Sequence, residues 1–236
     1  MSSAARSGTL EEGQVRAMFD RIAGPYDLMN SVMTAGLHHR WRERAADMAG
    51  VGPGDRALDV ATGTGDLAIE LARRVGSGGE VVGSDFSEGM LARAREKAPE
   101  LRWEHGNALA LPYADGEFDA ATVGFGARNF SDLERGLGEM VRVVRPGGRV
   151  VVLEITQPTR PPLSTFFSLW FDRVVPVLGR LAASEPEAYT YLPNSVKRFP
   201  GPEALAGLMH GVGLRDVRWI LTAGGIIAIH AGTVQR

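Results

Sequence analysis

The sequence predicts an α/β fold around a mostly parallel sheet of seven strands. From about residue 56 onward, short apolar segments alternate with helical segments, which is the pattern of a parallel sheet with helices on both faces. The last two apolar segments are separated only by residues 222–225, a connection short enough for an antiparallel hairpin. The 236 residues are 44% hydrophobic and 23% charged, which suits one globular domain with a substantial core.

Helices come first in the predicted order, over residues 11–49. Apolar residues of the first helix recur at helical spacing, at Val15, Met18, Phe19 and Ile22. Gly24-Pro25 ends this helix, and further helices are expected over residues 27–35 and 38–48. A turn over residues 50–55 then leads to the first strand.

The alternating part of the chain covers residues 56–156. Strands are expected over residues 56–61, 80–85, 101–105, 118–125 and 149–155, with helices over residues 66–75, 87–97 and 132–144. Pro146-Gly147-Gly148 is expected to end the last of these helices, because proline and glycine commonly follow a helix end.

Residues 157–200 break this alternation. They contain seven of the 13 prolines and an aromatic cluster of Phe166, Phe167, Trp170 and Phe171, and we interpret them as an inserted helical lid. Residues 201–236 return to regular structure, with a helix over residues 203–210 and strands over residues 217–221 and 226–230. The prediction is a single domain over residues 1–236, made of a helical cap, the alternating half, the lid and a terminal helix and hairpin.

Composition argues against several classes of protein. The 26 basic and 28 acidic residues give a net charge of -2, whereas general nucleic-acid binders are usually basic. The absence of cysteine excludes disulfides and a cysteine nucleophile and fits a reducing cytosol. The five histidines show no metal-ligand spacing, so we expect no metal. We find neither a signal peptide nor an apolar run that could span a membrane, and we expect a cytoplasmic protein.

The most informative local motif is a glycine loop between the first predicted strand and the next helix. Gly63 and Gly65 allow a tight turn and a close approach of the backbone to a ligand. Asp85 ends the following strand, about 20 residues on, where a carboxylate can accept hydrogen bonds from both hydroxyls of a ribose. The alternative is a tight turn and a solvated aspartate. The strand–loop–helix context favours nucleotide-like binding, which fits both NAD and S-adenosylmethionine.

Three features favour S-adenosylmethionine. The third glycine of the dinucleotide motif G-x-G-x-x-G is Ala68, the Tyr-x-x-x-Lys pair common in dehydrogenases is absent, and helices precede the first strand. The carboxylate of Asp66 beside the loop suits a ligand with ammonium and sulfonium charges and no pyrophosphate. An NAD(P)-dependent dehydrogenase is the alternative from a different class of enzyme.

Further motifs resemble those of the class I S-adenosylmethionine-dependent methyltransferases. They are Gly106-Asn107-Ala108 after the third strand, Leu111-Pro112-Tyr113 with Asp115, Phe118 and Asp119 before the fourth, and Arg142 with Arg145-Pro146-Gly147-Gly148 before the fifth. The resemblance implies the Rossmann-like fold of that class, in which the adenine is bound after the third strand.

Other motifs resemble the quinone-biosynthesis C-methyltransferases of the UbiE/MenG type. They begin with Phe19-Asp20-x-Ile22-Ala23-x-x-Tyr26-Asp27-x-Met29-Asn30, continue with Gly36-x-His38 and Trp41-Arg42, and include Phe125-Gly126-x-Arg128-Asn129. More follow over residues 189–200 and 221–232. The resemblance covers about residues 15–233 and therefore includes the lid, where the class of substrate is decided.

The resemblance also implies which residues contact the cofactor. They are Thr64, Asp85, Asn107 and Ala108. We expect further cofactor contacts from Asp59, Gly63, Gly65, Phe86 and Gly124. Some members of the ubiquinone branch have serine where this chain has Gly124, so a contact from that side chain is unavailable here. This difference favours the menaquinone branch.

The implied reaction moves a methyl group from a sulfonium to a ring carbon of a quinol. That carbon becomes nucleophilic when a ring hydroxyl loses its proton, so the site must exclude water, align the reacting groups and help to remove the proton. We expect Arg128, Asn129 and Tyr26 to be catalytic, with Arg128 stabilising the phenolate directly or through a water. The alternatives are a salt bridge for Arg128 and a helix cap for Asn129.

Substrate contacts are expected from the cap and the lid, at Asp27, Phe166, Trp170, Tyr189, Tyr191 and Ser195. Asp27 is equally suited to cap a helix, and the two tyrosines to pack in the core. The aromatic stripe of the lid either packs on the sheet or lines a tunnel for a polyprenyl tail. We interpret His38 and His230 as packing residues rather than bases. A polyprenyl substrate and an apolar lid are compatible with peripheral contact with a membrane surface and with a homodimer.

The predicted function is the C-methylation of demethylmenaquinol with S-adenosylmethionine, the last step of menaquinone biosynthesis. Three alternatives stay open besides the dehydrogenase. They are the polyprenyl-methoxybenzoquinol methylase of ubiquinone biosynthesis, another small-molecule methyltransferase, and a binding module without activity.

Overall fold

The computed structural model describes residues 12–24, 26–158 and 186–235, together with residues 161, 165 and 169. Its strands form one sheet in the order β3-β2-β1-β4-β5-β7-β6. The strands are β1 (Arg56–Val60), β2 (Glu80–Asp85), β3 (Arg102–His105), β4 (Phe118–Gly124), β5 (Val144–Ile155), β6 (Leu214–Thr222) and β7 (Ile227–Val234). The first five run parallel, and β7 is antiparallel to both β5 and β6. The predicted mostly parallel sheet with a terminal hairpin is confirmed.

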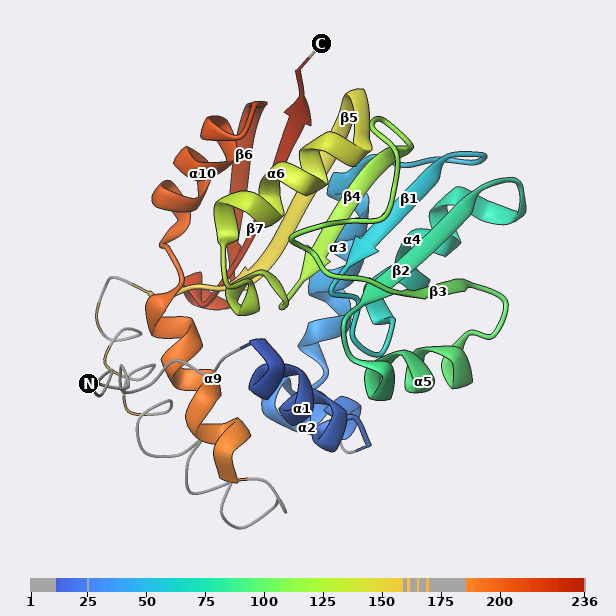
Figure 1. The fold of residues 1–236 in the computed structure, drawn as a ribbon. Helices are drawn as coiled ribbons and strands as arrows, with labels where there is room; N and C mark the ends of the chain where they lie inside the picture. Colours follow the sequence, from blue (N-terminus) through green and yellow to red (C-terminus); the bar gives the residue numbers. More distant parts are fainter. Residues whose placement is uncertain are drawn as a thin grey trace, which may run out of the picture.

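Helices cover both faces of the sheet (Figure 1). They are α1 (Glu12–Ile22), α2 (Tyr26–Thr34), α3 (Leu37–Ala49), α4 (Asp66–Val75), α5 (Glu88–Lys97), α6 (Leu133–Val143), α9 (Pro186–Arg198) and α10 (Pro202–Gly211), with short 3-10 turns at η1 (Gly76–Gly78), η2 (Ala127–Asn129) and η4 (Ala223–Gly225). One apolar core lies between the sheet and α3, α4 and α5, around Leu71 and Leu91. A second core lies between the opposite face and α6 and α10, around Leu137 and Met209.

Helix starts near the site follow ordinary capping rules. The Ser87 hydroxyl accepts the Met90 N–H at 3.2 Å at the start of α5, and the Asp132 carboxylate accepts the Arg135 N–H at 3.0 Å at the start of α6. Such caps satisfy backbone donors that have no partner inside the helix. The two caps therefore fix where α5 and α6 begin.

The predicted end of the helix before the fifth strand was wrong in one respect. Helix α6 ends at Val143, and Pro146-Gly147-Gly148 lies inside β5, which begins at Val144 rather than at Arg149. The register with β4 shifts there, from Phe118 opposite Val144 to Ala120 opposite Arg149. Gly147 has a φ of 84°, and a Cβ on Gly148 would lie 2.4 Å from the Asp119 carbonyl oxygen. The glycines thus form an irregularity within the strand instead of a helix end.

Two glycines let the first loop pack closely against the edge of the sheet. A Cβ added to Gly65 or to Gly83 would lie 2.4 Å from the Trp103 ring. Gly65 also has a φ of 87°, a backbone angle that residues other than glycine rarely adopt. The indole of Trp103 fills the space that the missing side chains leave, and it fixes the glycine loop above β2 and β3.

Part of the predicted lid is described. Helix α9 packs near η2 at the carboxyl end of the parallel strands (Figure 1). Phe166 and Trp170 and the side chain of Tyr189 lie outside the described residues, so the predicted apolar tunnel stays a prediction. Within the described part of the chain, no helix is long and apolar enough to cross a membrane.

Candidate functional site

A cavity that is partly open to solvent lies at the carboxyl ends of β1, β2 and β4. The N-terminal helices contribute Phe19, Tyr26 and Arg42 to its wall. Strand β1 is the point at which the strand order reverses, since β2 lies on one side of it and β4 on the other. Ligands of open α/β sheets bind at such a point. The cavity is therefore the candidate binding site.

Most of the predicted cofactor residues line this cavity. They are Asp59, Gly63, Thr64, Asp85, Phe86, Asn107, Ala108 and Gly124. Gly65 is not among the lining residues and instead shapes the loop against Trp103. Of the predicted catalytic and substrate residues, Tyr26 and Asn129 line the cavity.

The carboxylate of Asp85 fixes the glycine loop to the end of β2. Its Oδ2 accepts the Gly63 N–H at 2.8 Å and its Oδ1 accepts the Ser87 N–H at 2.9 Å. Burial raises the pKa of Asp85 to about 6. Each carboxylate oxygen has a further lone pair, so Asp85 retains the capacity to accept hydrogen bonds from a ligand in the cavity.

Asp59 provides a second buried carboxylate on the cavity wall. Its two oxygens accept the hydroxyls of Thr62 at 2.5 Å and Thr122 at 2.6 Å. Burial raises its pKa to about 6. The residues that follow β1 and β4, Ala61 and Phe125, also line the cavity and have φ values of 50° and 60°. Non-glycine residues in this conformation store strain, which concentrates at functional sites.

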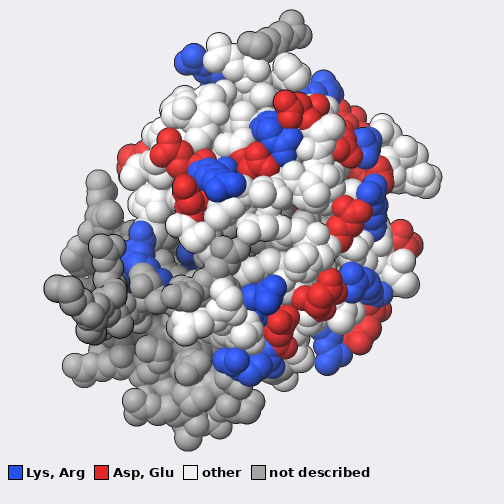
Figure 2. Space-filling model, in the orientation of Figure 1, with Lys and Arg blue, Asp and Glu red and all other residues white. Residues whose placement is uncertain are grey.

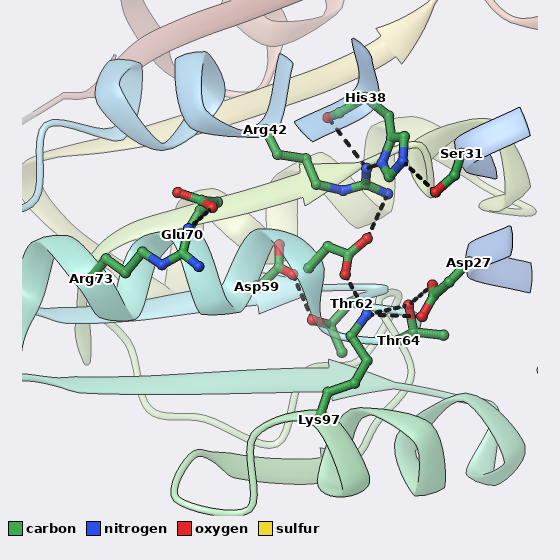
Figure 3. Close-up of polar contacts among 11 residues, drawn as sticks. Asp27, Ser31, His38, Arg42, Asp59, Thr62, Thr64, Glu70, Arg73 and Lys97 are labelled. Carbon is green, nitrogen blue, oxygen red and sulfur yellow. Dashed lines mark hydrogen bonds and ion pairs between the residues drawn. The ribbon is translucent and has the colours of Figure 1, made fainter. Parts of the chain in front are cut away.

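A network of charged side chains joins the N-terminal helices to the glycine loop (Figure 3). The Asp66 carboxylate pairs with Lys97 of α5 and, at 3.5 Å, with Arg42 of α3. Lys97 also pairs with Asp27 at 3.0 Å. The Thr64 hydroxyl donates to Asp27 at 2.5 Å. Asp27 lies in the first turn of α2, and these two contacts attach α2 to the glycine loop.

Helix α1 covers the other side of the cavity. The Asp20 carboxylate accepts the Ser87 hydroxyl at 2.5 Å and the Gly89 N–H at 3.0 Å, which attaches α1 to the start of α5. The ring of Phe19 lies 6.3 Å from that of Phe86 and 6.4 Å from that of Tyr26. No local pattern points to these roles of Asp20 and Lys97, because their partners are distant in the sequence and only the fold brings them together.

Arg128 does not line the cavity. Its guanidinium pairs with the Glu154 carboxylate at 2.6 Å, and the two side chains are 8% and 1% exposed. The salt-bridge alternative is thus the contact observed. Asn129 faces the cavity, and its Oδ1 accepts the Tyr191 hydroxyl at 3.1 Å. The helix-cap alternative for Asn129 is wrong, because Asp132 caps α6.

The remaining predicted residues whose side chains the structure describes do not line the cavity. Ser195 on α9 is 1% exposed, and Tyr191 reaches the site through Asn129. His38 and His230 are buried, as expected for packing residues, and the His230 Nε2 lies 3.0 Å from the Pro202 carbonyl oxygen. Among the residues whose side chains are described, no group of three or more His, Asp or Glu has the arrangement of a metal site.

Residues 7–234 match the sequence profile of the ubiE/COQ5 methyltransferase family. The chain belongs to this family. It is 49% identical to the demethylmenaquinone methyltransferase of Thermus thermophilus, over 91% of this chain and 99% of that one. It is 40% identical to the ubiquinone/menaquinone biosynthesis C-methyltransferase UbiE of Yersinia pestis, over 94% of this chain and 91% of that one.

A solved structure from Thermotoga maritima, described as an S-adenosylmethionine-dependent methyltransferase, has the same fold. It superposes with a TM-score of 0.66 at 20% identity and covers 92% of this chain and 98% of its own. The expected family and the expected class I methyltransferase fold are confirmed. The chain is therefore a methyltransferase whose methyl donor is S-adenosylmethionine.

The buried pair of Arg128 and Glu154 requires a double variant to test the catalytic role of Arg128. Arg128→Ala alone leaves the Glu154 carboxylate buried with backbone N–H donors but without a charged partner, which we expect to cost about 3–5 kcal/mol of stability. The double variant Arg128→Ala/Glu154→Ala removes both charges and should recover part of that loss. We expect it to bind S-adenosylhomocysteine nearly as well as the wild type and to have a kcat lower by about 100-fold.

Unfolding in denaturant measures the stability of these variants, calorimetric titration measures their affinity for S-adenosylhomocysteine, and a turnover assay measures their kcat. The single variant Glu154→Ala is the control for the loss of the carboxylate. A double variant that folds, binds the product nucleoside and keeps a kcat within a few-fold of the wild type would assign Arg128 to structure alone.

Proposed function

We propose that this chain methylates a ring carbon of demethylmenaquinol, with S-adenosylmethionine as the methyl donor. The observation that carries the proposal is the cavity at the carboxyl ends of β1, β2 and β4, which most of the predicted cofactor residues line together with Asn129 of the Arg-Asn motif. The name of the relative that is 49% identical supports the naphthoquinol as substrate.

The residues present fit the cofactor. The cavity has two buried carboxylates, the backbone of a glycine loop and the aromatic ring of Phe86 on its wall. A Cβ added to Gly63 would meet nothing within 4 Å, so the loop leaves open space beside it. Asp85 is proposed to bind the ribose, and Asn107 and Ala108 to border the adenine. When bound, S-adenosylmethionine supplies an electrophilic methyl group on its sulfonium.

The protein's own contribution is to exclude water and to orient the quinol. Helices α1 and α2 cover the cavity through Phe19 and Tyr26. Asn129 is held by Tyr191 and is proposed to contact a quinol oxygen. Arg128, the residue before Asn129, pairs with Glu154 of β5 and so holds η2 against that strand. Rigid support of this kind favours an aligned attack.

The benzoquinol of ubiquinone biosynthesis is the second candidate substrate. It is supported by the relative from Yersinia pestis, whose name includes both pathways.

At Gly124 an added Cβ would lie 3.0 Å from the Leu67 side chain, and Leu67 lines the cavity. A serine at this position would require the Leu67 side chain to move, so the present position of Leu67 depends on glycine at residue 124.

The proposal is tested by methyl transfer from labelled S-adenosylmethionine to two short-chain quinols under reducing conditions. We expect a clear preference for demethylmenaquinol over the methoxybenzoquinol in kcat/KM. Comparable turnover of the two would support an enzyme of both pathways. Transfer to neither, with S-adenosylhomocysteine still bound, would contradict the proposed substrate class.

We also propose that the protein is cytoplasmic and contacts the membrane surface peripherally. Leu28 and Val32, one turn apart on α2, are 70% and 72% exposed, and Leu37 at the start of α3 is 43% exposed. An exposed apolar face beside the site suits a substrate dissolved in the bilayer. If a second copy of the chain covered this face instead, the two copies would form the expected homodimer.

Flotation with liposomes tests the membrane contact. The variant Leu28→Ser/Val32→Ser should reduce the bound fraction several-fold, because it removes apolar surface without touching the core. The matched control is Leu221→Ser, which changes an exposed leucine (53%) on β6. Absence of binding to neutral and anionic liposomes, with and without quinol, would count against the contact.

A further inference from the structure

Acidic residues outnumber basic residues on the cavity wall. Asp59, Asp66 and Asp85 contribute carboxylates, and Arg42 is the one lysine or arginine among the described lining residues. S-adenosylmethionine carries one anionic group, the α-carboxylate of its methionine part. A carboxylate placed in a cavity with three acidic residues requires a cation beside it.

Arg42 is held in place before any ligand binds. Its side chain is 7% exposed, and its Nη2 lies 3.5 Å from the Asp66 carboxylate. Its Nη1 donates to the Nδ1 of His38 and, at 3.3 Å, to the His38 carbonyl oxygen. Its Cζ lies 5.4 Å above the ring of Phe125. A guanidinium fixed in this way loses little conformational entropy when it binds an anion.

His38 is the positioning residue for this guanidinium. Because its Nδ1 accepts from Arg42, its Nε2 carries the hydrogen and donates to the Ser31 hydroxyl at 3.1 Å. Burial, followed by the charge of Arg42, lowers the pKa of His38 to about 4. The imidazole therefore stays neutral near pH 7 and remains an acceptor. Figure 3 shows the contacts from Ser31 through His38 to Arg42.

The position of Arg42 along the sheet decides which part of the cofactor it meets. Asp85 and Asn107 lie at the ends of β2 and β3, whereas Phe125, beneath Arg42, follows β4. In the strand order these two sets are separated by β1 and the glycine loop. A cofactor whose ribose lies at Asp85 therefore extends its methionine part toward β4 and Arg42.

We propose that Arg42 binds the α-carboxylate of the cofactor through charge-assisted hydrogen bonds, with His38 fixing its orientation. The inference rests on the proposed placement of the ribose at Asp85. The fork of N–H groups on a guanidinium matches a carboxylate better than a single ammonium does. The Asp66 carboxylate does not fully neutralise the Arg42 guanidinium, because the same carboxylate also pairs with Lys97.

The test compares two ligands that differ only in this carboxylate. Calorimetric titration gives the affinities of S-adenosylhomocysteine and of its decarboxylated analogue, the 3-aminopropyl thioether. The wild type should bind S-adenosylhomocysteine about 10- to 100-fold more tightly, as expected for a charged hydrogen bond. Arg42→Gln should remove this preference, so that both ligands bind with similar affinity.

The matched control is Arg73→Gln, which removes the same charge from a side chain that is 66% exposed and pairs with Glu70. It should keep the wild-type preference. If Arg42→Gln fails to fold, Arg42→Lys retains the charge and should lose part of the preference through the lost fork. His38→Gln, which keeps a neutral acceptor, should bind S-adenosylhomocysteine more tightly than His38→Ala does.

Three results would overturn the inference. The first is that Arg42→Gln keeps the preference for the ligand with the carboxylate. The second is that it weakens the binding of both ligands by the same factor. The third is that it raises the KM for the quinol and leaves the binding of S-adenosylhomocysteine unchanged. The last result would assign Arg42 to the quinol. A wild type that binds S-adenosylhomocysteine with the expected preference and methylates neither quinol would contradict the proposed function and leave this inference intact.

Discussion

The attachment of the N-terminal helices to the glycine loop is the constraint on which the rest of the site depends. Asp66 begins α4 and pairs with Arg42 from α3 and with Lys97 from α5. Asp27 of α2 meets the same Lys97 and the hydroxyl of Thr64. Partly buried charges are costly unless they are paired, so these contacts favour one arrangement of the helices. The sheet alone would offer an open edge, and the helices make it a cavity.

Two buried carboxylates set the electrostatics of the cavity. Asp59 and Asp85 are withdrawn from water, and burial raises their pKa values to about 6. Each accepts two hydrogen bonds from the surrounding chain, which holds it in a fixed position for a ligand. Over the described part of the face drawn in Figure 2, basic and acidic side chains are interspersed without a large area of one sign. That face agrees with the small net charge and with a small-molecule site instead of a nucleic-acid surface.

The order of elements, the glycine loop and most of the cavity wall were predictable from the sequence, because each depends on local patterns. The strand–helix alternation placed Gly63 and Asp85 at one edge of the sheet, where the structure has them. Pairings between distant segments were not predictable. Asp27 and Lys97 are 70 residues apart, and nothing local shows that they meet. Arg128 was predicted from a motif, and only the fold shows that Glu154 is its partner.

The central claim, that the N-terminal helices are part of the cofactor site, is tested most directly by hydrogen exchange of the whole protein with and without saturating S-adenosylhomocysteine. Opening of the helices exposes their amides, and a ligand that contacts them suppresses that opening. We expect slower exchange in residues 12–49 together with the glycine loop and the end of β2. Slower exchange confined to residues 56–130, with α1, α2 and α3 unchanged, would contradict the account.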